Sequence, residues 1–259
     1  MIYLIPSLFI GHGAPTIIYD NNEYTDFLKS YSKTISKPKA IVIFSAHYES
    51  NIQLIGTSTP YEMIYDFYGF PKDLYSIKYQ VSSNDSLAMR VKTLLKESNI
   101  ESKLDPNRGI DHGAWTVLKL MYPNCDIPVI TMSVNTMLSN QGQYNIGKAL
   151  ECLRNEDVLI ICSGGIVHNL SKVSFDSEDV DPWANKFNEW IKDKISKWDL
   201  NQVLDYENNA PFAKLAVPRN EHFLELLIAM GTEQSNKKPA LLKSMYQYGN
   251  LSLDFWQFN

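Results

Sequence analysis

The chain has 259 residues, of which 44% are hydrophobic, and this is enough to bury the core of one α/β domain spanning residues 1–259. Its formal net charge of -5 argues against a polyanionic partner, because proteins that bind nucleic acid usually present a basic face. We therefore expect a small-molecule substrate and no nucleic-acid partner.

The cysteines and the N-terminal residues bear on location. Cys125, Cys152 and Cys162 are odd in number and form no C-x-x-C pair, which favours reduced thiols in a cytoplasmic protein over a disulfide framework or a zinc finger. The apolar run Ile2–Ile10 has no preceding Lys or Arg and contains Pro6, so we interpret it as a buried strand and not as a signal peptide. No apolar stretch approaches the roughly 20 residues that span a bilayer, and we expect no membrane partner.

Short apolar runs alternate along the chain with segments of helical spacing. The strand-length runs are Ile2–Ile10, Ala40–Ala46, Ile52–Gly56, Ile127–Ser133 and Asp157–Cys162. The helical segments are Tyr24–Tyr31, Ser86–Leu95, Ala114–Met121, Ile146–Leu153 and Trp183–Trp190. This alternation predicts the α/β class, with a largely parallel sheet between helical layers.

Two further segments have local signals of their own. The acidic, turn-prone stretch Ser174–Asp181 is typical of a surface loop. Near the C-terminus, Ser244–Tyr248 and Leu251–Phe258 flank Gly249-Asn250, which predicts a hairpin that closes one edge of the sheet. The aromatic residues of this hairpin suit either the core or an interface, so the oligomeric state is left open.

Three of the five histidines are expected where an apolar strand ends. His12 follows the first apolar run directly, His47 follows Ile41–Ala46, and His168 follows Leu159–Cys162 after a short glycine-containing link. The carboxyl ends of parallel strands line the crevice where ligands bind in open α/β sheets. We therefore expect these three side chains to converge.

The other two histidines, His112 and His222, are expected to begin helices, and such ends often display functional side chains. Taken singly, each histidine suits a capping or hydrogen-bonded structural role. A cluster of three to five indicates a metal without identifying it, because imidazole binds zinc, copper, iron and nickel alike. Glu49, Asp111 and Glu221 could ligate that metal or orient an imidazole, and as an alternative they are solvated or capping carboxylates.

One segment matches a nucleotide-binding motif incompletely. Gly142–Ala149 fits G-x-x-x-x-G-K, but Ala149 replaces the Ser or Thr whose hydroxyl would bind Mg²⁺. The chain contains no G-x-S-x-G, G-x-G-x-x-G or H-E-x-x-H motif. We therefore expect no phosphate loop and no dinucleotide-binding site.

Six motifs occur in order along the chain. They are Gly11-His12-Gly13-Ala14-Pro15, Ser45-Ala46-His47-Tyr48-Glu49, Tyr65-Asp66-Phe67-Tyr68-Gly69-Phe70-Pro71, Asp111-His112-Gly113-Ala114-Trp115, Ser163-Gly164-Gly165-Ile166-Val167-His168-Asn169-Leu170 and Glu221-His222-Phe223-Leu224. Together these motifs resemble the class III extradiol ring-cleaving dioxygenases of the DOPA 4,5-dioxygenase type. The match spans nearly the whole chain, and it implies a three-layer α/β/α fold with a mixed, largely parallel central sheet.

The resemblance also implies a role for each histidine. His12, His47 and His222 would coordinate one divalent metal, His168 would act as general acid/base, and His112 would contact substrate or bound dioxygen. The partners would be a catechol and O2. The aromatic segment around Phe67, Tyr68 and Phe70 would lie near the ring pocket, with plain core packing as the alternative.

Ring cleavage requires a redox-active metal with open positions, so Fe(II) is expected for catalysis. Zinc has no redox chemistry, but it binds nitrogen sites tightly enough to be found in purified protein. A departure from the pattern lies at Ala216-Val217-Pro218-Arg219, where many relatives have His-Pro and then a small polar residue, and it bears on substrate preference. Two rival functions are a zinc-dependent hydrolase and a non-catalytic binding protein of the same fold.

Overall fold

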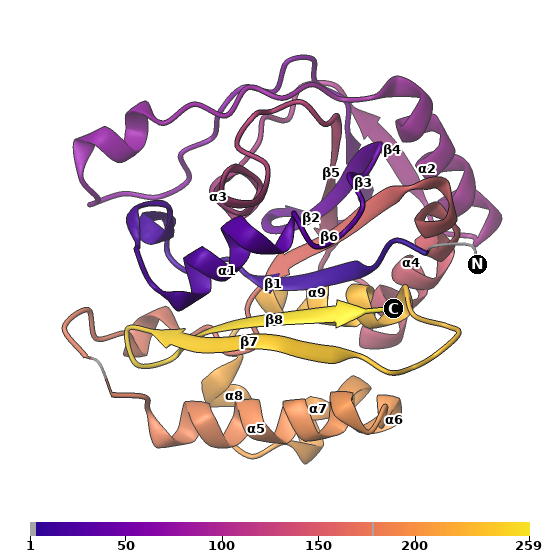
Figure 1. Ribbon diagram of the computed structural model, residues 1–259. Helices are drawn as coiled ribbons and strands as arrows, with labels where there is room; N and C mark the ends of the chain where they lie inside the picture. The colour runs from indigo at the N-terminus through magenta and orange to yellow at the C-terminus, as the bar shows by residue number, and fades with distance from the viewer. Residues whose placement is uncertain (1–3, 178) are drawn as a thin grey trace.

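In the computed structural model, which describes residues 4–177 and 179–259, eight strands form one mixed sheet with helices on both faces (Figure 1). The strands are β1 (Ser7–Gly11), β2 (Ala40–Ser50), β3 (Gln53–Gly56), β4 (Ser102–Asp105), β5 (Val129–Asn135), β6 (Val158–Gly164), β7 (Ala240–Gln247) and β8 (Leu251–Phe258). Their order across the sheet is β4-β3-β5-β2-β6-β1-β8-β7. The central strands β5, β2, β6 and β1 run parallel, which confirms the predicted α/β fold.

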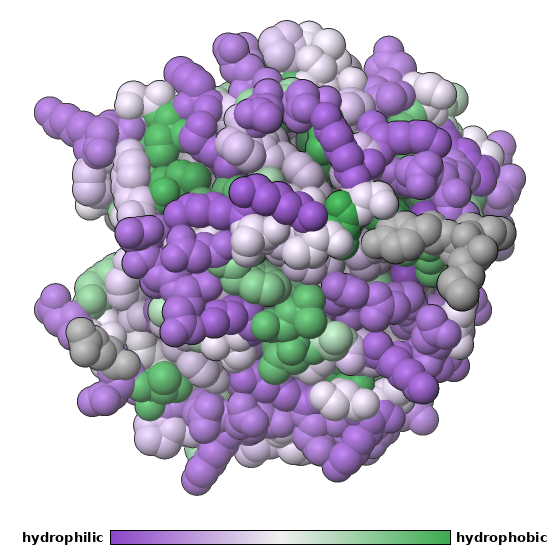
Figure 2. All heavy atoms as spheres, in the orientation of Figure 1, coloured by the Kyte–Doolittle hydropathy of each residue, from purple (hydrophilic) through white to green (hydrophobic). Residues whose placement is uncertain are grey.

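The helices lie between the strands along the chain and cover the two faces of the sheet. They are α1 (Glu23–Tyr31), α2 (Asp85–Glu97), α3 (His112–Met121), α4 (Asn140–Leu150), α5 (Pro182–Ser196), α6 (Leu200–Leu204), α7 (Tyr206–Asn209), α8 (Ala213–Ala216) and α9 (Glu221–Gly231), with 3-10 turns η1 (Pro15–Tyr19), η2 (Lys72–Ser76), η3 (Glu151–Glu156) and η4 (Leu170–Lys172). Helices α1 and α3 pack on one face, whereas α2, α4, α5 and α9 pack on the other. Figure 2, in the orientation of Figure 1, shows a mostly hydrophilic face on which apolar side chains form small separate groups.

Alternating side chains of β2 reach the two cores of the protein. Ile41 and Ile43 point toward α1 and α3, while Val42 and Phe44 point toward α2, α4 and α9. Because a strand with both faces buried has no polar face, it reads as a continuous apolar run in the sequence. This explains why the central strands were predictable without an alternating pattern.

Helix α4 and strand β4 differ from the sequence-based expectations. Helix α4 begins at Asn140, six residues before the predicted start at Ile146, because the Ser139 hydroxyl accepts from the Gly142 N–H and caps a polar first turn. It then gives way to η3 after Leu150. Strand β4 was not predicted, because its sequence Ser-Lys-Leu-Asp contains a single apolar residue and it is held by parallel pairing with β3.

The incomplete nucleotide motif lies inside helix α4, and a phosphate loop would have to precede a helix. Gly147 in this motif faces Gly231 of α9, and a Cβ on Gly147 would overlap the backbone oxygen of Ile228. The glycine is therefore explained by close packing of two helices.

The predicted C-terminal hairpin is present, and its outer strand β7 forms the edge of the sheet but begins at Ala240, four residues before the expected start at Ser244. Strand β8 runs antiparallel to β1, so the hairpin extends the parallel core with an antiparallel edge. Trp256 and Phe258 are buried and belong to the core. The predicted loop 174–181 contains no helix or strand in its described residues.

All three cysteines are free thiols. In the described part of the chain, no helix combines the length and the apolar character that crossing a bilayer requires.

Candidate metal centre and active site

All five histidines cluster at one end of the sheet, and four of them, His12, His47, His112 and His168, line a cavity. His12 follows β1, His112 is the first residue of α3, and His168 lies in the segment between β6 and η4. His222 lies in the first turn of α9, beside the end of β6. The expected convergence at the carboxyl ends of the parallel strands is therefore seen.

His47 differs in one respect from its expected place. It lies within β2 and not after it, because β2 continues through an irregularity between Phe44 and Glu49 and pairs again with β5 at Val134. Such a bulge reorients side chains locally. Here it allows an imidazole from the middle of a strand to face the cavity.

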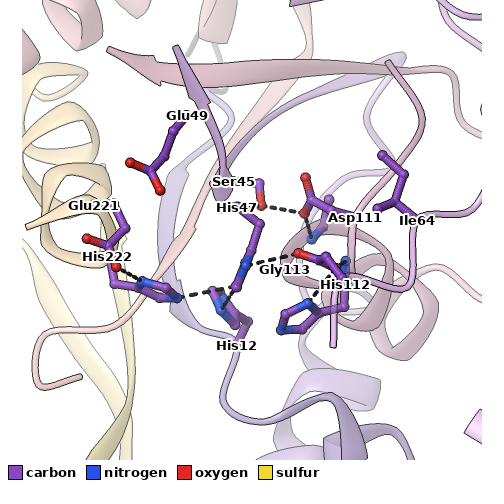
Figure 3. Close-up of polar contacts among 12 residues, drawn as sticks. His12, Ser45, His47, Glu49, Ile64, Asp111, His112, Gly113, Glu221 and His222 are labelled. Atoms are coloured by element: carbon purple, nitrogen blue, oxygen red, sulfur yellow. Dashed lines mark hydrogen bonds and ion pairs between the residues drawn. The ribbon is translucent and has the colours of Figure 1, made fainter. Parts of the chain in front are cut away.

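The Nε2 atoms of three histidines point toward one another (Figure 3). His47 Nε2 lies 3.1 Å from His12 Nε2 and 3.3 Å from His222 Nε2. One nitrogen from each of these rings lies within 4.8 Å of the others. Three nitrogen donors around one point are the donor set that a mononuclear transition-metal site uses.

The second ring nitrogen of each of these histidines meets an acceptor. The Ser163 hydroxyl donates to the Gly113 carbonyl at 2.5 Å and can therefore accept from His12 Nδ1, which lies 3.1 Å away. His222 Nδ1 lies 3.2 Å from Glu221 Oε1. With the proton on Nδ1, the lone pair of each Nε2 faces the common point, so the residues present fit a bound metal ion.

Asp66 connects two of the histidines, and sequence reasoning did not single it out. Its Oδ2 lies 3.0 Å from His47 Nδ1, and its Oδ1 lies 2.8 Å from His112 Nδ1. The same Oδ1 accepts from the backbone N–H of His112 at 3.2 Å. Asp66 belongs to an irregular segment whose sequence has neither helical nor strand periodicity. In such a segment, the sequence does not distinguish a functional carboxylate from an ordinary surface carboxylate.

The three carboxylates considered from the sequence have different surroundings. Glu221 contacts His222 Nδ1, as an orienting carboxylate would, and its Oε2 lies 3.3 Å from Arg219 Nε. Glu49 forms a 2.8 Å ion pair with the exposed Arg219 and does not contact a histidine nitrogen among the described residues. Asp111 caps α3 by accepting from Ala114 N–H.

Asp111 also ties α3 to strand β2. Its carboxylate accepts from the Ser45 hydroxyl at 2.5 Å and from Arg108 Nη2 at 3.1 Å. The same Arg108 nitrogen donates to the His47 carbonyl at 2.9 Å. Asp111 therefore supports the site from outside the ring of imidazoles.

Burial shapes the charge of the histidine cluster. Burial, reinforced by the neighbouring imidazoles, lowers the pKa of His12 and of His222 well below the usual value, so both rings are neutral and able to ligate. At His47 burial is outweighed by Asp66, Asp111 and Glu221, and the pKa is raised. A metal ion binding at His47 would therefore compete with a proton for Nε2.

Asp66 stays ionised in this cluster. Burial alone would raise the pKa of its carboxyl, but the hydrogen bonds from His112 and His47 outweigh burial and hold the pKa well below the usual range. A permanent negative charge therefore lies between two imidazoles and favours the Nδ1–H form of both.

His168 stacks on His222, with ring centroids 3.6 Å apart and the planes inclined by 9°. Burial and the imidazoles of His47 and His112 lower the pKa of His168 to about 3. The ring is therefore neutral at neutral pH, which leaves one ring nitrogen with a free lone pair. Its backbone N–H donates to the Ala216 carbonyl at 3.0 Å, which links the segment after β6 to α8.

The cavity beside the histidines has a volume of about 730 Å³. Its lining includes Phe67, Tyr68 and Phe70, so these aromatic side chains lie at the pocket as the resemblance implied. Phe67 also packs edge-on against the His112 ring, with centroids 5.5 Å apart. Val217, Pro218 and Arg219, where the sequence departs from many relatives, line a separate pocket of about 300 Å³.

The fold and site define an α/β protein with a buried, histidine-rich centre suited to one metal ion. Comparison with known proteins supports this description of the fold and the site. Residues 6–255 match the family model described as the catalytic LigB subunit of aromatic ring-opening dioxygenase. A 4,5-DOPA dioxygenase extradiol from Beta vulgaris is 39% identical over 256 residues, covering 97% of this chain and 96% of the relative.

A second relative, a 4,5-DOPA dioxygenase extradiol from Escherichia coli (strain K12), is 33% identical and covers 96% of this chain and 93% of its own. The crystal structure of an uncharacterized protein from Escherichia coli K12 superposes with a TM-score of 0.84 at 29% identity, covering 98% of this chain and 100% of that chain. The chain belongs to the LigB family and is an aromatic ring-opening dioxygenase, a class of enzymes that use a metal. The resemblance found from the sequence motifs is confirmed.

Proposed function

We propose that this protein opens the ring of a catecholic, DOPA-like substrate with O2 by extradiol cleavage. A mononuclear metal would be held by His12, His47 and His222, with His168 as general acid/base and His112 contacting substrate or dioxygen. The whole chain, residues 1–259, would form one catalytic domain in the cytoplasm. The single sheet and the three free thiols support that part of the proposal.

The observation that carries the proposal is the convergence of three Nε2 lone pairs at one wall of a cavity large enough for an aromatic ring. His47 Nε2 lies 3.1 Å from His12 Nε2 and 3.3 Å from His222 Nε2, so the three nitrogens are grouped around one point. The second nitrogen of each ring faces an acceptor, which keeps the lone pairs directed inward. The names of the relatives support DOPA as the first substrate to test.

Fe(II) is the metal proposed for catalysis. When bound, it would supply redox chemistry and open positions at which a catechol and dioxygen are brought together. Zn(II) would suit the same three nitrogens without that redox chemistry, so we expect zinc in part of any protein purified in air.

Side chains of this protein would transfer protons and contact the substrate ring. His168, neutral at neutral pH, would accept the proton of a catechol hydroxyl on binding and return it during ring opening. His112 has its Nδ1 tied to Asp66, so its Nε2 would be an acceptor facing the cavity. Phe67, edge-on to His112, would provide an apolar surface for the ring.

Metal analysis of anaerobically purified protein is the first test, followed by oxygen uptake after reconstitution with Fe(II). DOPA, protocatechuate and unsubstituted catechol would be offered in turn. We expect one metal per chain, oxygen uptake with at least one of these compounds and a yellow ring-opened product. One metal per chain without oxygen uptake on any catechol would contradict the proposal and favour a zinc-dependent hydrolase or a non-catalytic binding protein.

A further inference from the structure

Two glutamates beside the histidine cluster share one arginine. Arg219 Nη2 donates to both carboxylate oxygens of Glu49 at 2.8 Å, and Arg219 Nε lies 3.3 Å from Glu221 Oε2. The two carboxylates lie on the same side of the histidines, opposite Asp111 and His112 (Figure 3). One guanidinium therefore connects two carboxylates that come from different elements of the fold.

Each of the two connected elements carries a proposed metal ligand. Glu49 lies in β2, two positions after His47, and Glu221 is the first residue of α9, directly before His222. Glu49 follows the irregularity in β2 and pairs with β5, so the sheet fixes its position. Arg219 therefore connects the start of α9 to the strand that carries His47.

The contact reaches the metal centre through Glu221. Its Oε1 lies 3.2 Å from His222 Nδ1, whereas its Oε2 is buried. Among the residues that the structure describes, this Oε2 accepts no hydrogen bond, and the cation beside it is Arg219. Without Arg219 a charged oxygen would stay buried and unpaired, which is unfavourable. The carboxylate would then turn toward water and away from His222.

Arg219 is separate from the cavity in which a substrate is expected. Its side chain is 68% exposed, and together with Val217 and Pro218 it lines the pocket of about 300 Å³. Within residues 4–177 and 179–259, the lining of the histidine cavity includes none of these three residues. Their departure from many relatives would therefore act on the site indirectly.

We propose that Arg219 is a positioning residue of the metal centre. By pairing with Glu221 it keeps the Nδ1 proton of His222 hydrogen-bonded and the Nε2 lone pair directed at the metal, and by pairing with Glu49 it fixes α9 against β2. This inference rests on the proposed function, because it takes His222 as a metal ligand. Arg219 itself touches neither metal nor substrate.

Zinc affinity, measured by competition with a chelator of known affinity, tests the proposal without turnover. We expect Arg219→Met to weaken zinc binding by about 3- to 10-fold, a small effect because the ion pairs of Arg219 are largely exposed. Arg219→Lys keeps a positive charge at this position. It should therefore recover part of the affinity.

The ¹⁵N shifts of the histidine side chains in zinc-loaded protein supply a readout that a merely structural role would not move. In Arg219→Met the Nδ1 shift of His222 should change, because its acceptor Glu221 is released. The shifts of His12 should stay, because its Nδ1 lies 3.1 Å from the Ser163 hydroxyl and has no contact with Glu221 in the described chain.

Glu49→Gln removes the other end of the connection and provides a second variant. It should weaken zinc binding in the same direction as Arg219→Met. If both residues act through one contact, the double variant should bind zinc about as well as Arg219→Met alone. Additive losses would contradict a connection from Glu49 through Arg219.

Arg90→Met is the matched control. Arg90 forms an exposed ion pair with Glu156 at 2.8 Å, similar in kind to the pair of Arg219 with Glu49. Glu156 precedes β6, so this pair lies at the end of the sheet opposite the histidines. Its loss should change neither the zinc affinity nor the histidine shifts.

The outcomes separate the positioning role from its alternatives. Unchanged zinc affinity and unchanged His222 shifts in Arg219→Met would overturn the proposal, as would an equal loss of affinity in Arg90→Met. A changed ratio of kcat/KM for DOPA and unsubstituted catechol, with wild-type zinc affinity, would also overturn it and make Arg219 a determinant of substrate preference. The expected zinc and ¹⁵N results without oxygen uptake by the Fe(II)-loaded wild type would overturn the proposed function alone.

Discussion

The imidazole of His168 lies flat on that of His222, with ring centroids 3.6 Å apart and planes inclined by 9°. One of these rings is proposed to bind the metal and the other to move a proton. Contact between them means that a substitution at His168 can act in two ways, by removing the proton acceptor or by releasing the His222 ring. Variants that keep the stacked ring separate these effects.

His168→Phe should retain the metal and lose turnover. Phenylalanine preserves a flat ring against His222 but has no nitrogen, so kcat should fall by about 10²- to 10⁴-fold, the usual contribution of a general acid/base. The measurements are metal stoichiometry and single-turnover kinetics on Fe(II)-loaded protein. His168→Ala should lose a similar part of the rate, and loss of metal from the Phe variant would assign His168 a structural role.

His47→Ala should lose metal before any other single-histidine variant. Its Nε2 is the nitrogen that lies 3.1 Å from His12 and 3.3 Å from His222, so its removal opens the centre of the donor set. Zinc affinity would be measured by competition with a chelator of known affinity. His168→Phe is the matched control with one histidine fewer, and full metal stoichiometry in His47→Ala would remove His47 from the ligand set.

Asp66→Asn should weaken metal binding by about 10- to 100-fold, the usual effect of removing a carboxylate that orients a ligating imidazole. The carboxylate accepts hydrogen bonds at both oxygens, from His47 and from His112. Asparagine offers one acceptor and one donor, so one of the two histidines must rotate or change tautomer.

Zinc affinity and the ¹⁵N shifts of the histidine side chains would measure this effect of Asp66→Asn. The ¹⁵N shifts distinguish a change of tautomer from a general loss of structure. Glu62→Gln, at an exposed position four residues earlier in the same segment, removes a charge without touching a histidine. Unchanged histidine shifts and zinc affinity in Asp66→Asn would mean that Asp66 does not orient the imidazoles.

Glu225 in α9 should make the metal-free protein less stable as the pH rises. Burial raises the pKa of its carboxyl well above the usual value, and among the described residues neither of its oxygens has a hydrogen-bond partner. The unfolded chain releases this proton near the ordinary pKa, whereas the folded protein holds it. Stability is therefore lost progressively above the ordinary pKa of a glutamate and is unaffected below it.

Two substitutions at Glu225 separate charge from polarity. Glu225→Gln should remove this part of the pH dependence while leaving a buried polar group. Glu225→Met should also raise the free energy of unfolding at pH 7 by about 1–3 kcal/mol, the cost of an unpaired buried polar group. Urea unfolding in the presence of a chelator at pH 5 and pH 8 measures both, and identical pH slopes for wild type and Glu225→Gln would contradict the assignment.

Much of the fold could be predicted because its central strands are buried on both faces. The apolar runs that became β1, β2, β3, β5 and β6 are visible in the sequence without any knowledge of their partners. Strand β4 was missed because it is a short polar segment that depends on pairing with β3. Strand β4 therefore forms because it pairs with β3, and its own residues do not predict a strand.

The five histidines could also be selected from the sequence, since each was expected to follow a strand or to begin a helix. Their proposed roles stay predictions that the experiments above test. Asp66 lies within one of the six motifs, but the sequence assigned it no role, because its contacts are with His47 and His112, which lie 19 positions before it and 46 positions after it.

The sequence by itself determined the class of the fold, the family and the set of histidines, because these depend on local apolar pattern and on short motifs that can be read in order. Only the tertiary structure decided which nitrogens converge, which carboxylate contacts two imidazoles, and which side chains line the cavity beside them. The cavity lining includes Phe67, Phe175 and Leu251, which come from three separate segments of the chain. No local pattern records such an assembly, because the chemistry of a cavity is set by side chains that become neighbours only when the chain folds.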